Sequence, residues 1–216
     1  MRVIKTVRLF VITSALTIFF GFSNVTKNKI TKQNQMQKES RIAYFASGCF
    51  WCVEAIFESV EGVSEAISGY AGGHTTNPTY QTIGTGKTGH AEVVAVYYNP
   101  KKVSFKTLVD VFFGSHNPTT KNGQHPDYGS QYRSIAFYNN NTEKQTIEAA
   151  IKKLNKEVYQ GTIVTEVTKH NKFYEAEEYH QNYEKRNPYN SYIRNVSIPR
   201  LKRFQKKFPE ILKKNH

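Results

Sequence analysis

Cysteine is scarce in this sequence of 216 residues, which contains only Cys49 and Cys52. Because the two lie close together in the chain, they cannot join distant parts of a fold as the disulfides of small secreted proteins do. Structural zinc usually takes four ligands in two local pairs, and the sequence has no second Cys-x-x-Cys and no His-x-x-x-His pair. We therefore expect no metal, and we expect the two cysteines to form a redox-active pair.

Long apolar runs are also few, and the longest covers Leu9 to Phe22. It is short for a bilayer span, which needs ~20 residues. Basic residues precede the run and a polar stretch follows from Asn24, an order that is typical of an export signal. We predict that residues 1–23 are an export signal, or an N-terminal anchor if they are not cleaved. The predicted location is therefore exported: periplasmic, extracytoplasmic or membrane-anchored.

Acidic residues are outnumbered, with 17 Asp and Glu against 30 Lys and Arg and a net charge of +13. Such an excess can indicate nucleic-acid binding. However, residues 1–40 carry seven basic side chains against one acid, and residues 200–216 again carry seven against one. The segment between them is nearly neutral, so we expect no nucleic acid as a partner.

Two terminal segments are set apart by composition. Residues 24–40 are rich in Lys, Asn, Gln and Thr, which predicts a flexible linker. Residues 199–216 alternate apolar and basic side chains, which predicts a basic amphipathic tail. We favour packing of this tail on its own domain, and association with an anionic membrane, through the tail or the N-terminus, is the alternative. The catalytic domain is then predicted to cover residues 41–198.

Periodicity predicts strands and helices that alternate along this domain. The pattern indicates one α/β (α+β) domain, a two-layer sandwich of a mixed sheet with packed helices. The expected strands cover 42–46, 63–70, 91–98, 134–138 and 162–167, and the expected helices cover 49–59, 104–115 and 142–159. The last helix is expected to begin at a capping box formed by Thr142 and Gln145.

A glycine-rich segment at 84–89 satisfies the dinucleotide-binding pattern G-x-G-x-x-G and contains Gly-Lys-Thr. A Walker loop would need glycine at position 81, which is Gln81. Both nucleotide motifs also require a helix directly afterwards, whereas 91–98 is predicted to be a strand. The segment is therefore not expected to bind a nucleotide.

Cys49 is predicted to lie at the N-terminus of a helix, where free amides and the helix dipole favour a thiolate. We therefore expect a depressed pKa and a nucleophilic sulfur at Cys49. Side chains three residues apart on a helix have Cβ atoms ~5–6 Å from each other, so Cys52 can act as a resolving thiol. Phe50 and Trp51 lie between the thiols and could seat a small apolar group such as a methyl.

Six motifs together resemble the A-type peptide methionine sulfoxide reductase family, in order and at the family's spacing. Each motif is weak alone, but six in register are specific, and the resemblance covers residues 41 to 192. The motifs are Gly48–Trp51, Gly69–Gly73, Asn77–Tyr80, Thr88–Glu92, Asp127–Arg133 and Ala176–Gln181.

The resemblance implies a role for each matched residue and a fold of ferredoxin-like character. Cys49 matches the nucleophile and Glu92 matches the acid. Phe50 and Trp51 match the methyl pocket. Tyr80 and Tyr132 match the hydroxyl groups around the sulfoxide oxygen, and Asp127 matches a further polar residue. Because the sulfoxide oxygen must leave with a proton, we expect an aromatic, poorly solvated pocket to raise the pKa of Glu92.

The same resemblance implies reduction of methionine S-sulfoxide, free or in proteins, and repair of oxidised proteins. Cys49 would become a sulfenic acid and condense with Cys52 to a disulfide, which thioredoxin or a similar dithiol would reduce. Many family members instead carry Gly at the position of Cys52 and a recycling Cys near the C-terminus, which this chain lacks. No cofactor beyond the external dithiol is expected, and the expected state is a monomer.

Two rival hypotheses remain open at this point. A Cys-x-x-Cys pair near a strand and a helix can also signal a general thiol-disulfide oxidoreductase, which would have no use for Glu92. A surface-binding protein that works through its basic tail would lose its function when residues 200–216 are removed, but not when Cys49 is replaced by Ser.

Overall fold

The computed structural model describes residues 40–214. The predicted export segment lies outside the described residues, as does the predicted linker apart from Ser40. The described chain forms one compact unit that begins at Arg41 and includes the C-terminal segment. Among the described residues, no helix has both the length and the apolar character that a bilayer crossing requires.

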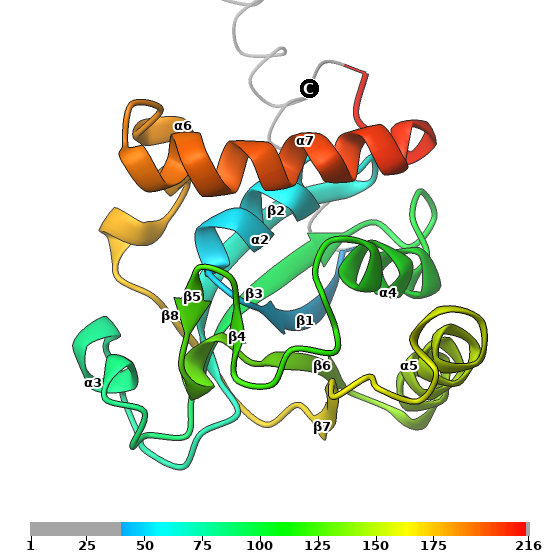
Figure 1. Ribbon diagram of the computed structural model, residues 1–216, viewed down its shortest axis with the longest axis horizontal. Helices are drawn as coiled ribbons and strands as arrows, with labels where there is room; N and C mark the ends of the chain where they lie inside the picture. Colours follow the sequence, from blue (N-terminus) through cyan, green and yellow to red (C-terminus); the bar gives the residue numbers. More distant parts are fainter. Residues whose placement is uncertain (1–39, 215–216) are drawn as a thin grey trace, which may run out of the picture. The chain divides into compact units, whose positions relative to one another are not determined.

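A six-stranded mixed sheet forms the centre of this unit, with strand order β7-β6-β1-β3-β2-β8 (Figure 1). Neighbouring strands are antiparallel except β6 and β7, which are parallel. The central strand β3 is buried along almost its whole length, as its two apolar faces predict. The strands are β1 (Arg41–Ser47), β2 (Val63–Ala71), β3 (Ala91–Tyr98), β6 (Ser134–Tyr138), β7 (Glu166–Lys169) and β8 (Phe173–Glu175).

Helices cover one face of the sheet, and α7 lies over α2 (Figure 1). The α-helices are α2 (Phe50–Glu58), α3 (Tyr80–Gly84), α4 (Phe105–Gly114), α5 (Asn141–Leu154), α6 (Tyr183–Arg186) and α7 (Ile198–Lys207). Shorter elements are β4 (Gly123–Gln124), β5 (Asp127–Tyr128), η1 (Ser130–Tyr132), η2 (Asn155–Tyr159), η3 (Glu178–His180), η4 (Ile193–Ser197) and η5 (Pro209–Ile211).

The predicted fold class is confirmed by this arrangement. In chain order, β1-α2-β2-β3-α4-β6 form a β-α-β-β-α-β unit whose strands lie in the order β6-β1-β3-β2. This is the ferredoxin-like connection pattern. The large core lies between the sheet and α2, α4 and α5, and a smaller cluster lies on the opposite face.

Two local predictions are wrong. Helix α5 begins after Asn140, whose side chain accepts the Glu143 N–H, so Thr142 is already inside the helix. A left-handed Gln160 ends the helical segment. The last strand is shifted toward the C-terminus, because Glu166 pairs with Ile135 of β6 while the Val164 N–H bonds to the Pro118 carbonyl.

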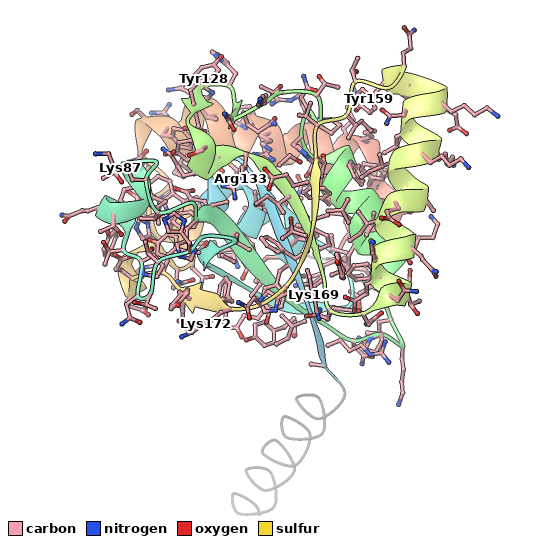
Figure 2. The ribbon with its side chains drawn as sticks, turned by 90° about the horizontal axis from the view of Figure 1, so that it is seen from below. Lys87, Tyr128, Arg133, Tyr159, Lys169 and Lys172 are labelled. Atoms are coloured by element: carbon pink, nitrogen blue, oxygen red, sulfur yellow. The ribbon has the colours of Figure 1, made fainter. Side chains whose placement is uncertain are left out.

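Long polar side chains tie the outer strand β7 to the rest of the sheet. Figure 2 shows Arg133 close to this strand when the molecule is viewed from below. Its guanidinium donates to Glu166 of β7 at 3.0 Å and to the Gly89 carbonyl at 3.0 Å. Arg133 thus joins β7 to the loop that leads into β3, the strand that carries Glu92.

The C-terminal segment packs against the helical layer of the domain. Phe204 of α7 is fully buried in the main core. After the helix, the chain pairs with the end of α2, because Glu61 N–H donates to the Ile211 carbonyl and Lys213 N–H donates to the Ser59 carbonyl. The apolar side chains of the segment therefore contribute to the core of the domain.

Candidate active site

A tight turn between β1 and α2 sets the position of Cys49. Gly48 has φ +89°, a left-handed conformation that favours glycine, and a Cβ there would lie 2.8 Å from the Cβ of Gln124. Cys49 follows as the residue that caps α2. The turn therefore places the thiol at the start of the helix, above the end of a central strand.

The two thiols are reduced and enclosed by protein, with 7% of Cys49 and 1% of Cys52 exposed. The expected depressed pKa of Cys49 is wrong for this pair, because burial raises the pKa of its thiol and a hydrogen bond to Cys52 raises it further. The pKa of Cys52 is lowered to about 6 by that hydrogen bond and, despite burial, by the Arg200 charge. Within the pair, burial therefore disfavours a charge on Cys49, and the Arg200 charge favours one on Cys52.

Glu92 binds the first backbone donor of α2. The Phe50 N–H, the first free donor of α2, donates to the Glu92 carboxyl at 2.9 Å. Glu92 is 2% exposed, and burial raises its pKa to about 8, with a smaller contribution from the negative charge of Asp127. Its carboxyl group is therefore largely protonated at neutral pH.

Tyr80 and Tyr132 lie around the same carboxyl group. Burial and the Glu92 charge raise the pKa of both phenols, and the Cys49 charge contributes to each. Both hydroxyls therefore remain hydrogen-bond donors at neutral pH. The structure thus brings Cys49, Glu92, Tyr80 and Tyr132 together from four separate elements.

Asp127 lies beside these groups and is linked to the thiols through a residue that sequence reasoning missed. The Tyr192 hydroxyl donates to Asp127 at 2.5 Å and lies 3.7 Å from the Cys52 sulfur. Burial raises the pKa of Asp127, and the hydrogen bond from Tyr192 opposes that rise. Tyr192 comes 140 residues after Cys52, and no motif identified in the sequence included it.

Aromatic side chains from several elements cluster around Phe50 and Trp51, the two residues that follow Cys49. Phe50 is buried, and its ring centroid lies 4.9 Å from His180 and 6.4 Å from Tyr80. Trp51 stacks on Tyr183 with ring centroids 3.7 Å apart. Both predicted pocket residues therefore lie among aromatic rings.

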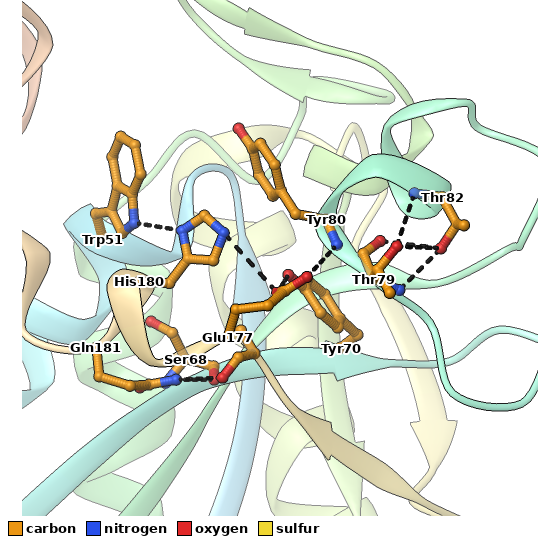
Figure 3. A network of polar contacts seen from close by, with 10 residues as sticks. Trp51, Ser68, Tyr70, Thr79, Tyr80, Thr82, Glu177, His180 and Gln181 are labelled. Atoms are coloured by element: carbon orange, nitrogen blue, oxygen red, sulfur yellow. Dashed lines mark hydrogen bonds and ion pairs between the residues drawn. The ribbon is translucent and has the colours of Figure 1, made fainter.

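A polar network behind the pocket fixes the aromatic rings (Figure 3). The Trp51 indole N–H donates to His180 Nδ1 at 3.2 Å. Glu177 accepts the Tyr70 hydroxyl at 2.7 Å and the Tyr80 backbone N–H at 3.0 Å. Glu177 and His180 belong to the matched motif Ala176–Gln181, but the motif alone predicts no role for either residue.

The chemistry of the site is that of a thiol pair with a proton donor. Within residues 40–214, no group of three His, Cys, Asp or Glu side chains could hold a metal ion. The geometry offers a thiol pair, a protonated carboxyl group, two phenol donors and a cluster of aromatic rings. Such a set can attack a polar sulfur centre and protonate the group that leaves it.

Comparisons with known proteins agree with this chemistry. A family model described as peptide methionine sulfoxide reductase matches residues 41–212. The chain is 47% identical over 169 residues to peptide methionine sulfoxide reductase MsrA of Natronomonas pharaonis, covering 78% of this chain and 95% of that one. It is 46% identical over 171 residues to the enzyme of the same name from Acinetobacter baumannii strain AYE, covering 79% and 98%.

Solved structures show the same relationship. Reduced Mxr1 from Saccharomyces cerevisiae has a TM-score of 0.67 at 33% identity, covering 71% of this chain and 88% of that one. Methionine sulfoxide reductase A of Corynebacterium diphtheriae has a TM-score of 0.65 at 34% identity, covering 70% and 77%. These matches show that the chain belongs to the peptide methionine sulfoxide reductase family, A type, whose members reduce methionine sulfoxide.

Proposed function

We propose that this chain reduces the S epimer of methionine sulfoxide, free or in proteins, with Cys49 as nucleophile and Glu92 as proton donor. The observation that carries the proposal is the buried Glu92 carboxyl, which accepts the Phe50 N–H at 2.9 Å and keeps its proton to about pH 8. A protonated carboxyl beside a thiol pair is what an oxygen leaving group requires. Phe50 and Trp51 receive the methyl group, and Tyr80 and Tyr132 donate to the oxygen.

The first step is transfer of one oxygen atom. A proton moves from Cys49 to Cys52 across their hydrogen bond, which gives the Cys49 thiolate without any change in the charge of the pair. That thiolate attacks the sulfoxide sulfur while Glu92 protonates the oxygen. The new bond between the two sulfur atoms then breaks as the protonated oxygen moves from the methionine sulfur to Cys49, so methionine leaves and Cys49 becomes a sulfenic acid. The Cys49 proton stays on Cys52 and Glu92 is left as a carboxylate, so the net charge of the site is unchanged.

The second step closes the disulfide. Cys52 attacks the Cys49 sulfenic acid, water leaves, and a Cys49–Cys52 disulfide forms. Cys52 is the resolving residue because the sequence contains no other cysteine beside Cys49. A thioredoxin-like dithiol then supplies two electrons and two protons to restore both thiols.

A comparison of three proteins tests this scheme. Full-length wild type, Cys49→Ser and Cys52→Ser are each given the two separated epimers of an N-blocked methionine sulfoxide, first without a reductant and then with thioredoxin. We expect wild type and Cys52→Ser each to form about one methionine per chain from the S epimer without a reductant. Only wild type should turn over with thioredoxin, and Cys49→Ser should be inactive.

Failure of the folded wild-type chain to reduce either epimer would contradict the proposal. The remaining rival is then the thiol-disulfide oxidoreductase, which predicts reduction of insulin disulfides that does not depend on Glu92. Circular dichroism of all three proteins shows whether a lack of activity reflects the loss of a thiol or the loss of the fold.

We also propose that the protein is exported. Support comes from the basic residues, apolar run and polar exit of residues 1–23. Cell fractionation followed by N-terminal sequencing tests this proposal. A start after Ser23 indicates cleavage, an intact Met1 in the membrane fraction indicates an anchor, and a soluble cytoplasmic protein with an intact N-terminus contradicts export.

A further inference from the structure

A cavity of about 420 Å³ lies between α7 and the loops that precede η1. Its volume is within the range of about 300–1,000 Å³ that is usual for ligand pockets. One wall is formed by Asp127 and Tyr192, and another by Arg200, Arg203 and Lys207 of α7. None of these five residues belongs to the aromatic pocket for the methyl group.

The cavity adjoins the reaction centre through Asp127 and Tyr192. These two side chains are hydrogen-bonded to each other at 2.5 Å, and Tyr192 lies 3.7 Å from the Cys52 sulfur. The charge of Asp127 also acts on Glu92. A group held in this cavity would therefore lie beside a sulfoxide that is held at Cys49.

The Arg200 charge acts on Asp127 and Cys52, but no cation of this wall lies within ion-pair distance of a carboxylate in residues 40–214. Arg200, Arg203 and Lys207 are spaced by three and four residues, so they lie on one face of α7. The Arg200 guanidinium donates to the carbonyls of Ser115 and Ser47. Within residues 40–214, none of the three cations forms an ion pair, whereas the Asp127 carboxyl is the only acidic group that lines the cavity.

We propose that this cavity is a subsite for residues that flank methionine sulfoxide in a protein substrate, and that it selects flanking Asp or Glu side chains. The proposal rests on the proposed function. Consecutive Cα atoms are about 3.8 Å apart, so a carboxylate next to the sulfoxide residue can reach the neighbouring cavity. Cys52 is only 1% exposed and lies behind Tyr192, so this wall suits a substrate better than an attacking reductant.

The test measures KM of the full-length chain with dithiothreitol, an uncharged reductant. The substrates are two blocked peptides with an S-sulfoxide, one flanked by Glu and one by Lys, and an uncharged N-blocked methionine S-sulfoxide amide. The test variant is Arg203→Glu with Lys207→Glu. The control variant is Lys202→Glu with Lys206→Glu, which has the same charge and spacing but reverses exposed residues outside the cavity.

We expect wild type to show a KM for the Glu peptide about three- to tenfold below that for the Lys peptide. The difference should shrink at high salt, because exposed charges are screened. The test variant should remove or invert the preference and the control should keep most of it. Every protein should reduce the uncharged amide with an unchanged kcat/KM.

Equal KM values for the two peptides, or a preference that survives the test variant, would overturn the subsite. A test variant that is impaired only when thioredoxin replaces dithiothreitol would also overturn it, and would assign the cavity to the reductant. If wild type does not reduce the uncharged amide at all, the proposed function itself fails. The two failures are therefore distinguishable.

Discussion

At the scale of single residues, Cys49 and Glu92 have opposite requirements within one buried site. The thiol must lose a proton and the carboxyl must keep one, yet burial raises the pKa of both. The pKa of Cys52 is shifted the other way, because its hydrogen bond with Cys49 and the charge of Arg200 lower it. The Phe50 N–H donates a hydrogen bond to Glu92, and this bond fixes the orientation of the carboxyl group.

These pKa values predict a bell-shaped dependence of single-turnover methionine formation on pH. Glu92 is protonated below about pH 8, so the rate falls as pH rises above 8. The thiol pair gains a proton below about pH 6, so the rate also falls there. Glu92→Gln should lower the rate by about 10²- to 10⁴-fold and remove the alkaline decline. An alkaline decline that persists in this variant would assign it to another group.

His180 is predicted to hold Trp51 in place. Since Nδ1 accepts the indole N–H, the neutral ring carries its proton on Nε2, which is 4.0 Å from Glu177. His180→Phe keeps an aromatic ring but loses the acceptor, so we expect KM to rise about three- to tenfold with a smaller change in kcat.

Fluorescence gives a second readout for this variant, because Trp51 is the only tryptophan in the sequence. We expect His180→Phe to shift the Trp51 emission. The matched control is His170→Phe, since His170 stacks on Tyr44 at 3.8 Å, away from the pocket. If both variants change KM equally, the effect is one of stability and the positioning role is wrong.

At the scale of secondary-structure elements, Glu54 joins α2 to β2 and to the loop before α6. It accepts the Ser68 hydroxyl at 2.5 Å and the Asn182 N–H at 2.6 Å, and it is 2% exposed. Burial raises its pKa to about 7. This acid is therefore a packing group whose charged form destabilises the folded state.

The sign of the resulting pH dependence follows from that pKa. Between the unfolded value of 4.5 and the folded value of about 7, the unfolded chain loses this proton first, so stability falls as pH rises through this window. Glu54→Gln should remove this pH dependence of stability. The change that it causes in the free energy of unfolding should be more stabilising at pH 8 than at pH 4, by roughly 1–3 kcal/mol. Urea unfolding at both pH values measures this, and an equal change in stability at both would contradict it.

The elements that were predicted well are those with strong local signals. The alternation of 91–98 and the apolar face of 49–59 correspond to β3 and α2. The start of α5 and the position of β7 were missed because they depend on competition between neighbours. Asn140 caps α5 in place of Thr142, and pairing with β6 sets where β7 begins.

At the scale of the whole molecule, the folded unit begins at Arg41, where the family match also begins. We predict that a chain of residues 41–216 folds and keeps the kcat/KM of the full-length protein, since the core and every site residue lie within it.

Removing residues 199–216 as well should abolish cooperative unfolding or lower Tm strongly, because Phe204 is buried in the core. Thermal unfolding and turnover of both truncations check this, and a stable, active 41–198 chain would contradict it.

The sequence by itself determined the family and the fold class, because these depend on local motifs and periodicity. Only the tertiary structure decided the direction in which the pKa of each thiol shifts, since Arg200, Tyr192 and Ser197 approach Cys52 from the far end of the chain. The tertiary structure also places the C-terminal segment along one side of the cavity that adjoins the site. The physical reason is that pKa values and packing depend on burial and on neighbours in space, which spacing along a chain does not specify.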